Sequence, residues 1–240
     1  MDIAFLADTF SQLTKGVPLT LQLAGTSVAL GLIIALILAI TLQSGTALLV
    51  WPIRAYVTTF RGTPLLVQIF LIYYGLGQFR PTLQALGLWG LFREPYWCAI
   101  LALTLNTGAY GTEIVRGGLQ SVPFGQIEAA RACGMSRWLV YRRVILPIAL
   151  RQALPAYGNE IILMIKGTSL TSIVTLLEIT GIAQQIISQT YRALEVFACA
   201  GAIYLTMNYI IAYALGGLEH RLSAHLRAAP DFESSVVVEG

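Results

Sequence analysis

Two charged residues, Glu160 and Lys166, lie within a largely apolar segment, residues 153–177. A charge near the centre of a lipid bilayer costs about 3 kcal/mol or more unless it is paired or hydrated, so each side chain needs a partner or a function. Six residues correspond to about 240° around a helix, so the two side chains point in different directions and do not neutralise each other. One interpretation is that the Glu160 carboxylate receives the ammonium or guanidinium group of a solute in a hydrated pathway.

A polar stripe is predicted in a second apolar segment, residues 96–114. Asn106, Tyr110 and Glu113 recur at i, i+4 and i+7, which places them on one face of a helix. Glu113 also lies three residues before Arg116, and an ion pair between them near the helix end is the simpler role for this carboxylate. Asn106 and Tyr110 are therefore predicted to line the pathway.

Hydroxyl groups follow shortly after Lys166, on Thr168, Ser169 and Thr171. They offer donors and acceptors to a zwitterionic solute, although Ser, Thr and Asn side chains also commonly bridge packed membrane helices. Lys166 has a similar alternative, a charge pair with a second subunit. We predict a substrate pathway formed by Asn106, Tyr110, Glu160, Lys166, Thr168, Ser169 and Thr171.

The residue patterns needed for catalysis are missing from the sequence. No GxxxxGK(S/T) phosphate loop occurs, because Lys15 follows Thr14 and Lys166 follows Ile165. No histidine lies in an apolar segment, where it could activate a serine nucleophile, and no cluster of histidines and cysteines has metal-ligand spacing. We predict no catalytic residue, no metal site and no cofactor bound by this chain, so any energy source must be a partner.

The composition indicates an integral membrane protein. Of the 240 residues, 56% are apolar and 11% are charged, against about 25% charged residues in soluble domains; the mean hydropathy is +0.71. A net charge of +3 with two lysines gives no basic field for nucleic acid. Three separated cysteines exclude a secreted disulfide scaffold. We expect an all-α membrane protein.

Five segments are predicted to be membrane helices, since a bilayer core requires about 20 mostly apolar residues: residues 19–42, 64–79, 96–114, 153–177 and 196–218. They define a transmembrane domain, residues 16–218, that contains a cytoplasmic loop, residues 118–150. We expect the tail, residues 219–240, to be short, disordered and cytoplasmic. Ten basic residues lie on the side of the loop and four on the other side, which places the N-terminus outside and the C-terminus in the cytoplasm.

The cytoplasmic loop is predicted to form two short helices. Pro123 can open the first helix, and Gly134 can adopt the left-handed conformation that ends it. Ser136 is a plausible N-cap for a second helix from Arg137 to Ile145, which Pro147 ends or kinks. From composition alone, an amphipathic hairpin resting on anionic lipid explains this loop equally well.

The segment FRGTPLL, residues 60–66, is predicted to begin the second membrane helix. Thr63 is a reasonable N-cap and Pro64 suits the first helical turn. Arg61 is expected at the cytoplasmic lipid headgroups. We expect no substrate contact in this segment.

The loop carries the pattern E-A-A-x3-G-x9-(I/V)-x-L-P from Glu128 to Pro147, with Val144 at the position where isoleucine is usual. It resembles the signature loop of permease subunits of bacterial ABC importers. The segments FRGTPLLVQ (60–68) and NEIILMIKGTSL (159–170) are similar to the polar amino-acid class, which transports histidine, glutamine, arginine and opines. The resemblance covers residues 16–218.

The resemblance implies the type I ABC importer permease fold and an ATP-driven import of a polar or basic amino acid or opine across the bacterial inner membrane. The implied partners are ABC ATPase subunits that bind ATP and Mg, a second permease subunit of the same or another kind, and a periplasmic solute-binding protein. In such permeases the loop is a coupling helix that contacts the ATPase, and here its residues are Glu128, Ala129, Ala130, Gly134 and Pro147.

Glu128 is a candidate to pair with a basic residue of the ATPase, and a weak pair with Arg131 on its own helix is the alternative. Two other classes of protein also remain open. An ion-coupled secondary transporter or channel would usually contain inverted repeats, and none is visible. A membrane scaffold that does not transport would tolerate replacement of Glu160 and Lys166.

Overall fold

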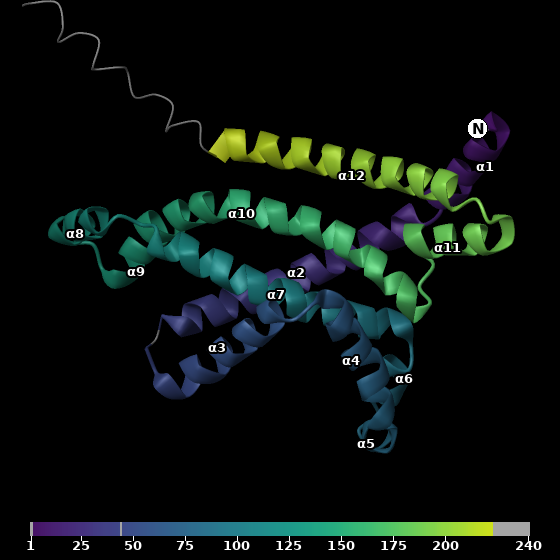
Figure 1. Ribbon diagram of the computed structural model, residues 1–240. Coiled ribbons are helices and arrows are strands. Elements are labelled where there is room, and N and C mark those ends of the chain that lie inside the picture. Colours follow the sequence, from purple (N-terminus) through teal and green to yellow (C-terminus); the bar gives the residue numbers. More distant parts are fainter. Residues whose placement is uncertain (1, 44, 223–240) are drawn as a thin grey trace, which may run out of the picture.

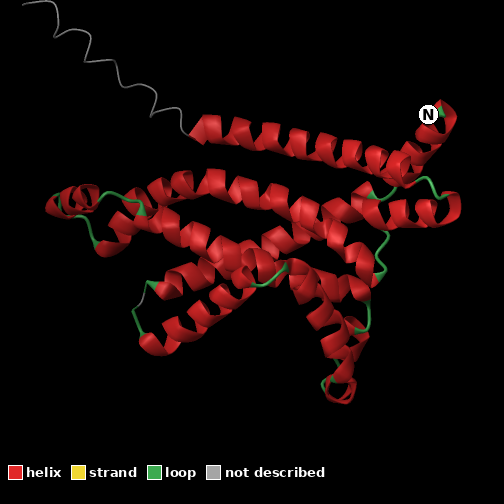
Figure 2. Ribbon diagram, in the orientation of Figure 1, coloured by secondary structure: helices red, strands yellow, loops and turns green. Residues whose placement is uncertain are grey.

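The computed structural model describes residues 2–43 and 45–222, and in these ranges every regular element is a helix (Figure 2). The all-α prediction is therefore confirmed. Residues 219–222 continue the last helix, whereas the rest of the predicted tail, residues 223–240, lies outside the described residues. The elements are α1 (Ile3–Thr14), α2 (Val17–Leu42), α3 (Ala47–Gly62), α4 (Leu65–Gln78), α5 (Arg80–Ala85), α6 (Trp89–Phe92), α7 (Pro95–Gln120), α8 (Phe124–Ala132), α9 (Arg137–Val140), the π-helical turn η1 (Tyr141–Ile145), α10 (Leu146–Gly167), the 3-10 helix η2 (Thr168–Val174), α11 (Ile179–Thr190) and α12 (Ala193–Leu222).

The five predicted membrane segments lie mainly in helices, but the segment at residues 64–79 corresponds to α4, which has only 14 residues, and the structure supports fewer than five spans within the described residues. By length and apolarity, two single helical stretches of the described chain could cross a membrane, Ile3–Leu42 and Ala193–Arg221, and up to four could do so if each bent helix pair counts as one span. The remaining predicted segment, residues 96–114, lies in α7, whose 26 residues extend about 39 Å. α7 needs less apolar surface than the others because it packs between α2, α3, α4 and α10.

Small residues let the central helices approach closely. A Cβ atom added to Gly111 of α7 would lie 2.9 Å from the Cβ atom of Ala35 in α2, and one added to Gly118 would lie 2.6 Å from the carbonyl oxygen of Ala149 in α10. Such small-residue contacts are typical of packed membrane helices. α2 presents a row of buried small residues with a spacing of four: Ser27, Gly31, Ala35 and Ala39.

The prediction for residues 43–66 was wrong in two respects. Arg54 and Arg61 were expected in a loop, but they belong to α3, and the chain bends by 110° between α3 and α4. Thr63 was expected as N-cap, but Pro64 occupies that position and no side chain caps α4. The tertiary contacts of α3 with α7 and α2 stabilise a helix that hydropathy alone did not indicate.

Pro147 does not end the helix that begins at Arg137, because the chain is continuously helical to Val174. A proline ring collides with the carbonyl group four residues earlier in an α-helix. Here the turn before Pro147 is a π-helix, in which the Leu146 amide donates to the Tyr141 carbonyl, five residues back. The wider turn accommodates the proline.

α8 and α9 lie at one end of the bundle, and α1 and α11 lie at the other end (Figure 1).

Glu178, which the sequence analysis did not identify, connects the start of α11 to α12 through a buried carboxylate. Glu178 is fully buried and accepts hydrogen bonds from the amides of Thr180 (3.0 Å) and Gly181 (2.9 Å), so it caps α11. It also accepts from the Tyr204 hydroxyl of α12 at 2.6 Å. An acidic residue directly before a helical stretch is the signal for such a cap.

Candidate functional site

A cavity of about 260 Å³ lies where the α3–α4 bend meets α7 and α10, and we call it the Glu160 cavity. It contains three of the seven predicted pathway residues, Asn106, Tyr110 and Glu160. The sequence predicted that these residues share a pathway, and the structure brings them into one cavity. The full lining is Thr63, Pro64, Leu65, Asn106, Tyr110, Glu160, Leu163 and Met164.

Glu160 supplies the carboxylate of this cavity. Its side chain is 6% exposed, and no basic side chain within the described residues forms an ion pair with it. A buried carboxylate without a cation is costly in a protein interior. The cavity is therefore suited to a solute that carries a cationic group.

Gln68, which the sequence analysis did not identify, forms hydrogen bonds with two residues that line the cavity, Thr63 and Asn106. The side chain is 4% exposed, and its Nε2 donates to the carbonyl oxygens of Phe60 (2.7 Å) and Thr63 (3.1 Å) and to Thr63 Oγ1 (2.9 Å). Its Oε1 accepts from Asn106 Nδ2 at 2.9 Å. One amide therefore satisfies the backbone freed at the bend and connects it to α7. A glutamine four residues after the Thr–Pro pair was the available signal.

Replacing Gln68 by leucine should destabilise the protein. The substitution keeps the side-chain volume but leaves the Phe60 carbonyl, the Thr63 carbonyl and the Asn106 amide without this partner, and an unsatisfied buried group such as the Asn106 amide costs about 1–3 kcal/mol. We expect thermal unfolding in detergent to shift down by roughly 5 °C or more. Gln78→Leu, an exposed position at the end of the same helix, is the matched control, and equal shifts for both variants would contradict this role.

The other four predicted pathway residues do not line this cavity. Lys166 is exposed in the last turn of α10. The hydroxyl groups of Thr168, Ser169 and Thr171 donate to backbone carbonyls three residues earlier, at 2.6–2.7 Å. In a continuous α-helix Glu160 and Thr171 would lie on the same face. Because the chain changes to a 3-10 helix at Thr168, this alignment is lost.

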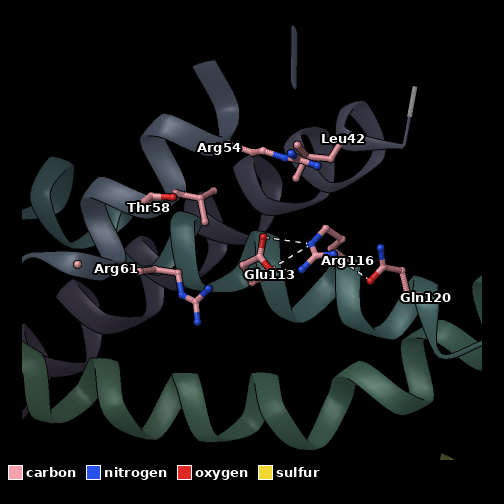
Figure 3. Close-up of a pocket in the computed structure, with 9 residues that line it drawn as sticks. Leu42, Arg54, Thr58, Arg61, Glu113, Arg116 and Gln120 are labelled. Atoms are coloured by element: carbon pink, nitrogen blue, oxygen red, sulfur yellow. Dashed lines mark hydrogen bonds and ion pairs between the residues drawn. The ribbon is translucent and has the colours of Figure 1, made fainter. Parts of the chain in front are cut away.

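A second, larger cavity continues along α7 toward the α8 end. We call it the arginine cavity; its volume is about 560 Å³ and its lining is Leu42, Arg54, Val57, Thr58, Arg61, Gly62, Glu113, Arg116 and Gln120 (Figure 3). Arg116 donates from Nε to both Glu113 oxygens, each at 3.1 Å, and from Nη1 to Gln120 at 2.9 Å. The predicted Glu113–Arg116 pair is thus present.

Arg61 and Tyr110 join the two cavities. The Arg61 guanidinium carbon lies 5.4 Å from the centre of the Tyr110 ring, within the range of a cation–π interaction. The Tyr110 hydroxyl donates to the Arg61 carbonyl at 3.4 Å. Arg61 was expected at lipid headgroups, and that expectation stays a prediction; the structure shows Arg61 exposed on the lining of the arginine cavity, beside Tyr110 of the Glu160 cavity. The segment FRGTPLL was expected only to begin a helix, but its residues Thr63, Pro64 and Leu65 also line the Glu160 cavity.

The α8 end carries the predicted two-helix loop. Gly134 has φ of +77°, and the amides of Gly134 and Met135 donate to the carbonyls of Arg131 (2.9 Å) and Ala130 (3.2 Å). This is a Schellman motif, which satisfies the last carbonyls of α8. Ser136 accepts from the Leu139 amide at 3.4 Å and caps α9. Both turn predictions are confirmed.

The predicted coupling residues divide into exposed and buried members. Glu128 and Ala129 are exposed on α8, and within the described residues Glu128 forms no ion pair, so its alternative pairing with Arg131 is not made. Ala130 is 8% exposed and packs inward. Pro147 is half-buried behind η1. A free carboxylate on an exposed helix is available to a partner, whereas Ala130 and Pro147 are less accessible.

The sequence matches a family described as "Binding-protein-dependent transport system inner membrane component" over residues 27–224. It is 58% identical to the octopine transport system permease protein OccM of Rhizobium meliloti, over 92% of this chain and 90% of the relative. It is 44% identical to the arginine ABC transporter permease protein ArtM of Escherichia coli K12, over 76% of this chain and 81% of the relative. A solved structure of an amino acid ABC transporter with histidines is 34% identical, with a TM-score of 0.82, and the match covers 92% of this chain and 99% of that chain.

The family match covers both cavities and the α8 loop. The family and these relatives are membrane permease subunits, so ATP hydrolysis belongs to a separate subunit of such transporters. The chain therefore belongs to the family of inner membrane components of binding-protein-dependent transport systems, as a permease subunit of an ABC importer.

Proposed function

We propose that this permease subunit translocates guanidine-containing solutes, arginine or an arginine-derived opine. The observation that carries the proposal is Glu160, a buried carboxylate without an ion pair among the described residues, in a cavity between the central helices. A guanidinium group donates two parallel hydrogen bonds to a carboxylate and stays charged at all physiological pH values. The relatives named for octopine and for arginine share this group.

The proposed assembly contains two ABC ATPase subunits that bind ATP and Mg, a second permease subunit, and a periplasmic solute-binding protein. Both cavities are partly open on a single chain, which supports a second permease subunit that completes the pathway. Pathway roles for Thr168, Ser169 and Thr171 would require an arrangement of η2 other than the present one, and a pathway role for Lys166 would require a different position of the end of α10.

The α8 end faces the cytoplasm in this proposal, with the N-terminus periplasmic and the C-terminus cytoplasmic in the bacterial inner membrane. The concentration of arginines at the α8 end supports this orientation. Glu128 and Ala129 then face the ATPase, while Ala130, Gly134 and Pro147 hold the coupling loop in shape. The surface of α11 lies on the periplasmic side, where the solute-binding protein docks.

Reconstitution of the complete transporter in vesicles tests this function. We expect uptake of labelled arginine or octopine that requires ATP, the ATPase subunits and the binding protein, and ATP hydrolysis that the loaded binding protein stimulates. Leucine, which has no charged side chain, is the control solute. Uptake without ATP would contradict an ATP-driven importer, and equal uptake of leucine would contradict the guanidine class.

A further inference from the structure

The arginine cavity has an excess of positive charge that its own residues do not neutralise. Among the described residues its lining holds three guanidinium groups, those of Arg54, Arg61 and Arg116, and one carboxylate, that of Glu113. Arg116 is the cation that Glu113 binds. No carboxylate in the described chain lies within ion-pair distance of Arg54 or Arg61. Concave surfaces lined by one sign of charge concentrate the opposite ion.

The charged groups of the cavity come from two helices, although Arg54 and Arg61 are themselves exposed residues. Arg54 and Arg61 come from α3, and Glu113, Arg116 and Gln120 come from α7; Figure 3 shows the three α7 side chains next to one another and the two arginines extending separately from α3. Its volume, about 560 Å³, is in the range of small-molecule sites. Tyr110 and Glu113 also hold Arg61 and Arg116 in place, through the ring contact and the ion pair.

The arginine cavity lies next to the Glu160 cavity along α7, on the proposed route of the solute. One face of α7 continues from Asn106 and Tyr110, which line the Glu160 cavity, to Glu113 and Gln120, which line the arginine cavity. Arg61 of the arginine cavity contacts Tyr110 of the Glu160 cavity. A solute that leaves the Glu160 cavity toward the α8 end therefore meets Arg61 first and then Arg54.

We propose that the arginine cavity binds the carboxylate groups of the solute while Glu160 holds or releases its cationic end, so that the solute leaves carboxylate end first. This inference rests on the proposed function and adds a second determinant of substrate class, the number of carboxylates. Arg54 and Arg61 each form charge-assisted hydrogen bonds with a carboxylate. A solute with two carboxylates engages both, and arginine, with one, engages one of them.

Anionic lipid is the other source of an anion at this end of the bundle. A phosphate headgroup would be recognised by the same guanidinium groups. The mixed lining, in which Glu113 and Gln120 accompany the arginines, favours a zwitterionic solute. The membrane composition used in the test separates the two sources.

The test measures equilibrium binding of labelled solutes to the complete membrane complex of permease and ATPase subunits in nanodiscs of phosphatidylcholine. Three probes differ in carboxylate number: agmatine has none, arginine has one, and N2-(1-carboxyethyl)arginine has two. The variant is Arg54→Gln with Arg61→Gln. We expect its affinity to fall at least about tenfold for the two-carboxylate probe, less for arginine, and not at all for agmatine.

The matched control is Arg93→Gln, an exposed position whose ion pair is with its neighbour Glu94. It should leave all three affinities unchanged. Thermal unfolding of each variant complex establishes that it is folded, and Arg54→Lys with Arg61→Lys should retain most of the two-carboxylate affinity.

Several outcomes would overturn the inference. Equal losses for all three probes would make the arginines structural. Competition by inorganic phosphate as strong as by the two-carboxylate probe would make the site one for free anions. An arginine-dependent effect that appears only when phosphatidylglycerol is added would assign the cavity to lipid headgroups. If agmatine binding depends on Glu160 while the arginines have no effect, the proposed function stands and this inference fails; if the wild-type complex binds none of the probes, the proposed function itself fails.

Discussion

Replacing Glu128 by lysine should abolish most ATP-driven uptake while leaving the helical bundle folded. Glu128 is exposed on α8 and forms no ion pair within the described chain, so the variant loses no contact of the bundle itself. Glu128 is expected to pair with a basic residue of the ATPase, so a lysine at this position would face another positive charge. Like charges at an interface cost several kcal/mol. We expect uptake to fall at least about tenfold.

The measurement compares uptake and ATP hydrolysis in vesicles that contain equal amounts of wild-type or variant complex. Gln126→Lys is the matched control: it adds the same charge to the same exposed helix, but two residues earlier, which is about 200° around the helix. It should reduce uptake much less. Normal uptake by Glu128→Lys would show that this carboxylate does not contact the ATPase.

Glu160→Gln should reduce transport of cationic solutes strongly. The glutamine has nearly the same volume as the 6% exposed glutamate and can still accept a hydrogen bond, so the main change in the cavity is the lost charge. A hydrogen bond to a charged group contributes about 1.5–3 kcal/mol, which corresponds to roughly a tenfold to hundredfold change in affinity. We expect uptake of arginine at limiting concentration to fall by that factor.

Uptake at several arginine concentrations, together with the basal rate of ATP hydrolysis, checks this prediction. The basal rate should be unchanged because the cavity that holds Glu160 contains no residue of α8. Glu94→Gln removes a carboxylate from an exposed pair with Arg93 and is the control. If Glu160→Gln transports arginine at the wild-type rate, the carboxylate has a structural role only.

Features that depend on local sequence were predictable. Gly134 and Ser136 are read from residue type and spacing because the left-handed residue and the cap are properties of a few consecutive residues. The polar face of α7 was predictable for the same reason, since helical periodicity alone aligns Asn106 with Tyr110. These predictions required no knowledge of which helices pack together.

Features that depend on contacts between distant segments were not predictable from one sequence. Gln68 satisfies carbonyl groups before the bend and an amide in α7, 38 residues later, so its role appears only after folding. α3 contains two arginines and was assigned to a loop because hydropathy does not include the contact with α7. The hydroxyls after Lys166 were assigned to a pathway because the change to a 3-10 helix was not visible.

The network of Gln68 has a mechanical consequence. Gln68 belongs to α4, and its side-chain amide donates to the carbonyl groups of Phe60 and Thr63 at the end of α3. The same side chain accepts a hydrogen bond from Asn106 of α7. Rotation of α4 against α3 would break these bonds together, at a combined cost of several kcal/mol. We therefore expect α3 and α4 to move as one rigid unit, and the conformational change of the proposed transport cycle to occur elsewhere in the subunit.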